Sequence, residues 1–259
     1  MKNLRLLLIA LLLLLLVGIE WAYILFWPSV RPSPPASTNQ TNQTNQANNV
    51  TPPANTTPPT TSLNGTRVFQ VTSSSESYKQ TQLVTATPSA TGRSISIDAS
   101  DDRSATNRTQ GRVQIDPSGS YSITFYSASE NGSTFECEGN LPVYLAVGTD
   151  TAPVSLSCSF NGTAVGSVTG TATAGAATDY VFNGKTYKAR TTTVRASISA
   201  GPAATQADTV TYIAAPGIGS LETHGSLGQL IVGQITAQAN ITSSDKLLEA
   251  DNDTLFLPK

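Results

Sequence analysis

The stretch Ser94–Ser100, "SISIDAS", alternates Ile95, Ile97 and Ala99 with polar side chains. Successive side chains of a β-strand point to opposite faces, so this period of two predicts a strand with one apolar and one polar face. The same alternation recurs in Tyr121–Ala128, "YSITFYSA". One buried and one solvated face is typical of antiparallel sheets.

Turn signals separate the expected strands. "DPSG", Asp116–Gly119, has Pro and Gly where a type I turn favours them. Asn183-Gly184 within "VFNGKTYKA" is the strongest short hairpin signal. Further strands are expected in "APVSLSCSF", "TVRASIS" and "QLIVGQITAQA". Only "SSDKLLEA" near the end favours a short helix, capped by Ser243 or Ser244. The fold class is therefore all-β, an antiparallel sheet shaped as a curved half-barrel or a sandwich.

An apolar segment, Leu6–Trp27, precedes the strands and contains a single ionisable residue, Glu20. About 20 apolar residues cross a bilayer as a helix. Lys2 and Arg5 precede it, which predicts a cytoplasmic N-terminus of residues 1–5 and a transmembrane signal-anchor over residues 6–27. The alternative is a cleaved signal peptide and a secreted protein, but bulky residues follow Gly18 where a peptidase needs small ones.

Residues 28–66 form a Pro/Thr/Asn-rich segment with "TNQ" repeated from Thr38 to Gln46. Such a composition cannot offset the entropy of ordering, so we expect a disordered stalk. Extended at polyproline II rise, its uncharged part, Pro32–Thr66, would reach about 100 Å. An extracytoplasmic β-domain is expected over residues 67–242 and a C-terminal tail over 243–259.

Asn-x-Ser/Thr sequons occur in the stalk and in the β-domain. They mark glycosylation sites if the source organism glycosylates, and ordinary turn and linker residues if it does not. The sequons begin at Asn39, Asn42, Asn49, Asn55, Asn64, Asn107, Asn131, Asn161, Asn240 and Asn252.

Charged residues make up 12% of the chain and the formal net charge is −2. No basic block is present, which argues against a nucleic-acid partner. The expected contacts are with the membrane through the N-terminal helix, and with an unknown surface protein, glycan or apolar ligand.

Cys137 and Cys158 are the only cysteines and lie in expected strands. On the oxidising side of a membrane, a lone cysteine pair usually forms a disulfide. The alternative is two buried thiols.

Part of the chain resembles a group of uncharacterised extracytoplasmic bacterial domains. The resemblance covers Leu141–Gly225 and is carried by "LPVYLAVG", "FNGKTYKA" and "YIAAPGIG". Ala214 departs from the aromatic residue that the group often has before its Ala-Pro-Gly. Those domains are thought similar to the half-barrels of periplasmic lipoprotein carriers, so the resemblance implies a secreted β-domain with a concave face, and no catalytic residues.

His224 is the only histidine, and Glu222, two residues before it, would share its face of a strand and could orient the imidazole. "SSDK", Ser243–Lys246, matches the S-x-x-K of acyl-enzymes, but neither partner motif follows. Asp98, Asp101 and Asp102 lack EF-hand spacing for calcium. We therefore assign no catalytic, cofactor or metal residue.

The chain is expected to be a non-enzymatic binding or structural module, held away from the membrane by its stalk. One alternative is a carrier of an apolar ligand in a curved sheet. The other is a hydrolase of envelope polymers that uses His224.

Overall fold

The computed structural model describes residues 61–73, 76–104, 107–130, 132–200, 203–205, 208–232 and 235–258. These residues form β-strands joined by turns, with no helix among them. The strands are β1 (Leu63–Ser73), β2 (Ser77–Ser89), β3 (Gly92–Asp101), β4 (Arg108–Ile115), β5 (Tyr121–Glu130), β6 (Ser133–Tyr144), β7 (Thr151–Phe160), β8 (Thr163–Phe182), β9 (Lys185–Ala200), β10 (Ala203–Thr205), β11 (Asp208–Ala215), β12 (Gly219–Val232) and β13 (Ile235–Ala250).

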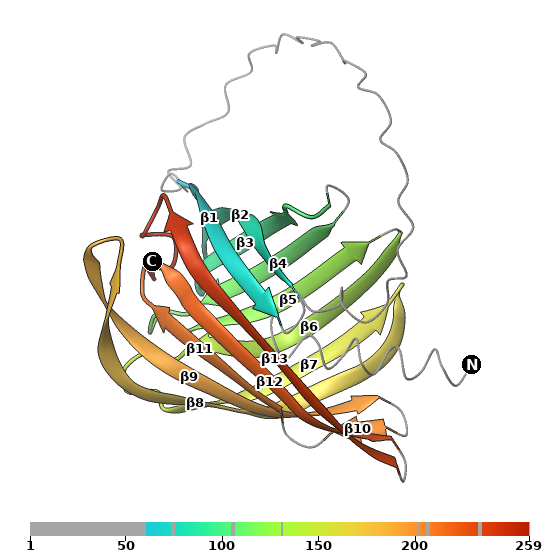
Figure 1. Cartoon of the computed structure of the whole chain (residues 1–259). Helices are drawn as coiled ribbons and strands as arrows, with labels where there is room; N and C mark the ends of the chain where they lie inside the picture. Colours follow the sequence, from blue (N-terminus) through green and yellow to red (C-terminus); the bar gives the residue numbers. More distant parts are fainter. Residues whose placement is uncertain are drawn as a thin grey trace, which may run out of the picture.

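The sheet closes on itself as an antiparallel barrel (Figure 1). Strands β1 to β9 pair in chain order, β9 pairs with β11, and β11 pairs with β12. β13 pairs with both β12 and β1, which completes a ring of 12 strands. The short β10 lies beside β9 and β12. The all-β antiparallel prediction is confirmed, whereas the half-barrel and the sandwich are both wrong.

β13 closes the ring, and it also replaces the short helix that the sequence predicts. Ser243–Ala250, where a short helix was expected, is the second half of β13. Its backbone is paired on both sides, for example Leu247 with Phe69 of β1 and Lys246 with Glu222 of β12. Two ladders of hydrogen bonds outweigh a weak local helix preference and remove the open edges that a half-barrel would expose. β1, which pairs with β13, begins at Leu63, before the expected start of the domain at residue 67.

Both predicted hairpins are present. The turn Asp116–Gly119 joins β4 to β5, and the Gly119 N–H donates to the Asp116 carbonyl at 3.0 Å. Asn183 and Gly184 join β8 to β9 with φ of 49° and 75°. Positive φ at both central residues is the geometry of the type I′ turn that Asn-Gly favours.

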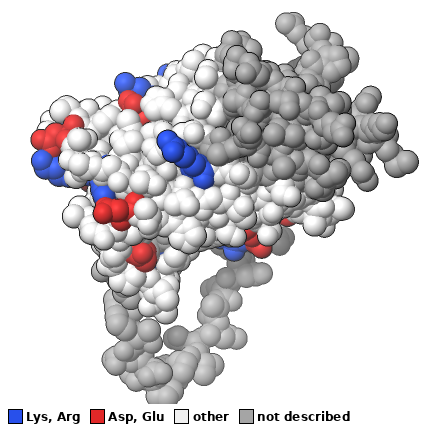
Figure 2. All heavy atoms as spheres, turned by 90° about the horizontal axis from the view of Figure 1, so that it is seen from below, with Lys and Arg blue, Asp and Glu red and all other residues white. Residues whose placement is uncertain are grey.

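Apolar side chains gather inside the barrel. Buried residues such as Val84, Ile95, Val113 and Val194 belong to one continuous interior cluster. Charged side chains are few and scattered over the face seen in Figure 2. The period of two therefore sorts apolar residues to the inside of the ring and Ser and Thr mainly to the outside.

After β13 the chain crosses one end of the barrel and covers it. Arg93 Nη1, at the start of β3, donates to the Thr254 carbonyl at 2.9 Å, and Phe256 pairs with Gly217 in the β11–β12 turn. Phe256 is 2% exposed. Gly219 has a φ of 83°, and a Cβ there would lie 2.7 Å from the Phe256 ring. Only glycine at position 219 lets the chain turn and Phe256 insert.

Candidate ligand-binding cavity

The barrel interior contains a cavity of about 90 Å³. A space of about 10 to 15 Å³ measured this way already holds one water molecule, so this cavity has room for a small organic group. Its wall is mostly apolar and includes Phe69, Ile97, Val113, Ile123, Val143 and Phe256. Its lining residues with polar groups are Arg67, Gln80, Gln82, Thr109, Tyr121, Tyr126, Tyr212, Ser220, Thr223 and Asp245.

The period of two in β1 and β2 directs the polar residues inward. Arg67 shares a face with Phe69 and Val71, which are both buried. In the β1–β2 register Arg67 lies opposite Gln82, and Phe69 lies opposite Gln80. The guanidinium and the two amides therefore lie on adjoining strands and face the same interior.

Arg67 is 3% exposed. One of its Nη atoms donates to the Ser220 carbonyl, and its guanidinium lies 4.7 Å from the Phe69 ring centroid and 5.0 Å from that of Phe256. Its Nε–H has no hydrogen-bond acceptor. Burial lowers the pKa of Arg67 to about 10, so the group stays protonated at neutral pH.

Tyr121 supplies a second unpaired donor. Its side chain is 2% exposed and packs against the rings of Tyr144 and Phe256, each with a centroid 5.4 Å away. Its hydroxyl has no hydrogen-bond partner. Burial raises the pKa of Tyr121 and the charge of Arg67 opposes that shift, so the hydroxyl keeps its proton and lies within electrostatic reach of the guanidinium.

Two further polar side chains of the lining, Gln82 and Asp245, offer acceptor oxygens. Gln82 Nε2 donates to Gln80 Oε1 at 2.9 Å, which leaves Gln82 Oε1 without a donor. Burial raises the pKa of Tyr212, and the negative charge of Asp245 raises it further. Across the described strands and turns, no carboxylate lies within ion-pair distance of Arg67.

Cys137 and Cys158 face each other across β6 and β7, with their Cα atoms 4.1 Å apart. Both side chains are buried in the interior cluster, and the two sulfurs lie at disulfide distance, as the sequence predicts. The pair forms part of the barrel wall and does not line the cavity.

His224 and Glu222 share the outer face of β12, as expected from their spacing. His224 Nε2 lies 3.2 Å from Glu222 Oε2, and the Tyr180 hydroxyl donates to Glu222 Oε1 at 2.6 Å. Burial alone would raise the pKa of Glu222, but the hydrogen bonds from Tyr180 and His224 and the charge of Lys246 lower it. The group is a surface carboxylate held by three partners, on the opposite side of the wall from the cavity.

The S-x-x-K motif does not bring its two side chains together. Ser243 is buried, whereas Lys246 is exposed on the outer face and approaches Glu222 at 3.5 Å. Residues three apart on a strand point to opposite faces, so this serine and this lysine cannot form a catalytic pair.

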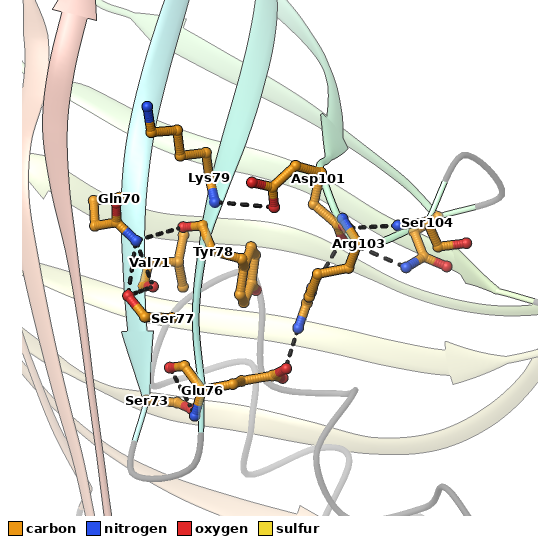
Figure 3. A network of polar contacts seen from close by, with 12 residues as sticks. Gln70, Val71, Ser73, Glu76, Ser77, Tyr78, Lys79, Asp101, Arg103 and Ser104 are labelled. Carbon is orange, nitrogen blue, oxygen red and sulfur yellow. Dashed lines mark hydrogen bonds and ion pairs between the residues drawn. The ribbon is translucent and has the colours of Figure 1, made fainter. Parts of the chain in front are cut away.

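The three aspartates considered for calcium lie in the last residues of β3 or just after it, and each has its own partner. Arg103 lies between Asp101, at 3.0 Å, and Glu76, at 2.6 Å, and its guanidinium stacks on Tyr78 (Figure 3). Asp98 pairs with Arg108 at 3.4 Å, while Asp102 accepts the Lys79 N–H at 3.2 Å. Within the described ranges, no group of three metal-ligating side chains is found.

The sequons occupy different environments. Asn107 is buried and its Nδ2 lies 3.4 Å from Asp101 Oδ2. Asn161 adopts a φ of 47° in the β7–β8 turn, and the Asn252 amide donates to the Asn64 carbonyl at 3.0 Å. Asn240 belongs to β13. The sequons outside the described residues are those at Asn39, Asn42, Asn49, Asn55 and Asn131.

Sequence reasoning did not single out the cavity residues. The available signal was Arg67, a charged residue on the otherwise apolar face of "RVFQV" in β1, and the pair Gln80 and Gln82 on the face that continues to Val84 in β2. A polar residue at an inward position is informative because burial without a partner costs free energy.

In the part of the chain that the structure describes, no helix is long and apolar enough to cross a membrane. The expected anchor, Leu6–Trp27, lies outside these residues. Comparison of the chain with protein-family models, with curated proteins and with solved structures finds no match.

Proposed function

We propose that this protein is a non-enzymatic binding module that takes one small, mainly apolar ligand into the interior of its barrel. The observation that supports this most directly is the cavity of about 90 Å³ inside the ring of strands. Protein interiors are close-packed, and small barrels are normally filled by their own side chains. A mostly apolar space with a few convergent polar groups is typical of ligand sites.

Gly111 allows the cavity to be filled without straining the backbone. A Cβ added there would meet Ile97 at 3.7 Å, an ordinary contact, and the residue lines the cavity. Gly111→Leu should therefore project its side chain into the space. Ser100→Val adds bulk on the exposed face of the neighbouring strand β3 and serves as the control.

The test uses xenon, a neutral probe that enters apolar cavities of this size. The full chain should shift the xenon NMR resonance in proportion to protein concentration, Ser100→Val should leave that shift unchanged, and Gly111→Leu should reduce it. Equal shifts for wild type and Gly111→Leu would show that the cavity is not occupied. Mass spectrometry of a solvent extract of the purified chain should then identify the bound compound.

The site also operates, in this proposal, outside the cytoplasm. Its support is the sequence: the apolar segment Leu6–Trp27 with Lys2 and Arg5 before it, followed by a stalk that has no charged residue from Pro32 to Thr66. Fractionation of the host and N-terminal sequencing of the mature chain test it. A mature soluble chain that begins after Trp27 would contradict the anchor.

A further inference from the structure

The geometry points to a small amphiphilic carboxylate as the ligand, with its head group at Arg67 and Tyr121 and its hydrocarbon tail against the apolar wall of the cavity. This inference rests on the proposed binding function and adds the chemical class of the ligand. Three observations support it: an unpaired buried charge, a second donor beside it, and the size and polarity of the space.

The unpaired charge is the guanidinium of Arg67. Charged side chains are almost never fully buried without a counter-charge, because desolvation of an ion costs several kcal/mol. Arg67 has the Ser220 carbonyl and two aromatic rings as neighbours, and its Nε–H is left without an acceptor. An anion bound beside Arg67 would supply the missing acceptor and a direct ion pair, which Asp245 in the same lining does not form with Arg67.

The second donor is the Tyr121 hydroxyl, which is buried, protonated and unpaired. A carboxylate has two oxygens with several lone pairs and can accept from an Arg N–H and a hydroxyl together. Hydrogen bonds to an ionised acceptor are roughly twice as strong as neutral ones. Arg67 and Tyr121 both line the same cavity, so one head group can reach both.

Two acceptors of the lining argue for a defined position of that head group. The unpaired Gln82 Oε1 and the Asp245 carboxylate would both repel an anion placed against them. A carboxylate is therefore held on the Tyr121 side of Arg67. A neutral ligand with a hydroxyl would instead donate to Gln82, which makes an alcohol of the same length the decisive comparison.

The size of the cavity restricts the tail. Sites for drug-sized ligands enclose about 300 to 1,000 Å³, well above the 90 Å³ available here. Most of the remaining lining surface is apolar and includes the side chains of Ile97 and Val113. A short monocarboxylate matches this space, and a lipid with a large polar head does not.

The experiment titrates hexanoate and hexan-1-ol into the full chain by calorimetry, with the variants Arg67→Met and Tyr121→Phe. Arg112→Met is the matched control, because Arg112 also lies over a Phe ring, that of Phe125 at 4.3 Å, but on the exposed side of β4. We expect wild type and Arg112→Met to prefer hexanoate. Arg67→Met should weaken hexanoate binding roughly ten- to hundredfold and leave hexan-1-ol binding unchanged or tighter. Tyr121→Phe should weaken hexanoate binding about two- to tenfold.

The outcomes separate this inference from the proposed function. If Arg67→Met weakens both ligands equally, or if hexan-1-ol is preferred by wild type, the carboxylate is wrong while cavity binding stands. If neither ligand binds and xenon detects no cavity, both proposals fall. Should Arg67→Met not fold, Tyr121→Phe removes only one hydroxyl and decides the same comparison.

Discussion

The wall formed by β6, β7 and β8 turns apolar side chains inward, whereas the wall formed by β13, β1 and β2 turns several polar ones inward. Leu156 and Val168 are buried on the first wall, and Arg67, Gln80 and Gln82 face the interior on the second. Both walls follow the same period of two. Inward position is thus set by the strand, and the identity of the inward residue decides whether a wall is only packed or also carries a site.

The two arginines Arg67, in β1, and Arg103, just after β3, also differ. Near one end Arg103 is paired with Asp101 and Glu76, so its charge is balanced by the protein. Arg67 is more deeply buried, and no carboxylate of the described residues forms an ion pair with it. The charge of Arg103 is balanced within the protein, whereas the guanidinium of Arg67 is the group that we propose binds a carboxylate.

The largest effect is expected where the C-terminal segment covers one end of the barrel. Phe256 touches Tyr121 and Arg67, and Phe256→Ala should lower the free energy of unfolding by about 3 to 5 kcal/mol, the usual cost of a buried Phe→Ala change. Urea unfolding measures it. Leu257→Ala, at the adjacent residue that is 39% exposed, is the control and should change little. Equal effects would mean that the C-terminal segment does not pack against the barrel end.

The apolar wall is tested through its cysteine pair. Cys137→Ala together with Cys158→Ala should lower the free energy of unfolding by about 3 kcal/mol, because a cross-link restricts the unfolded chain. Reduction of the wild-type chain should have a similar effect and should not affect the double variant. Insensitivity of the wild type to reductant in urea would contradict the cross-link.

The polar wall should respond in the opposite direction. Arg67→Met removes an unpaired buried charge and keeps most of its apolar volume, so the ligand-free chain should become more stable, by about 2 kcal/mol. Thermal unfolding of extracted, ligand-free protein measures the change. A loss of stability would show that Arg67 has a structural role at this position.

The smallest effect is expected at Glu222, on the outer face of β12 opposite Lys246 of β13. Its folded pKa is lowered, so ionised Glu222 contributes stability above its unfolded pKa, and this contribution is lost as pH falls through the folded pKa. Glu222→Gln should reduce the acid sensitivity of unfolding between neutral pH and about pH 3, by less than about 1 kcal/mol. Glu249→Gln, on the exposed face of β13, is the control. An unchanged pH profile in Glu222→Gln would show that Tyr180 and His224 do not stabilise the ionised carboxylate.

The sequence alone predicted much of the local structure. "SISIDAS" is part of β3, "YSITFYSA" is part of β5, and Asn183-Gly184 turns the β8–β9 hairpin. These features depend on neighbours in the chain: alternation selects the buried face, and a turn needs residues that tolerate positive φ. The cysteine pair was also within reach, because two cysteines allow only one partner choice.

Closure of the barrel and the cavity were decided only by the tertiary structure. Ala250 lies beside Arg67 although the two are almost at opposite ends of the described chain, and this pairing converts a segment with helical spacing into the strand that completes the ring. Whether Arg67 finds a carboxylate depends on which distant strands surround it. A sequence states which residues are charged or apolar, but the cost of a buried charge depends on neighbours that only the closed sheet brings together.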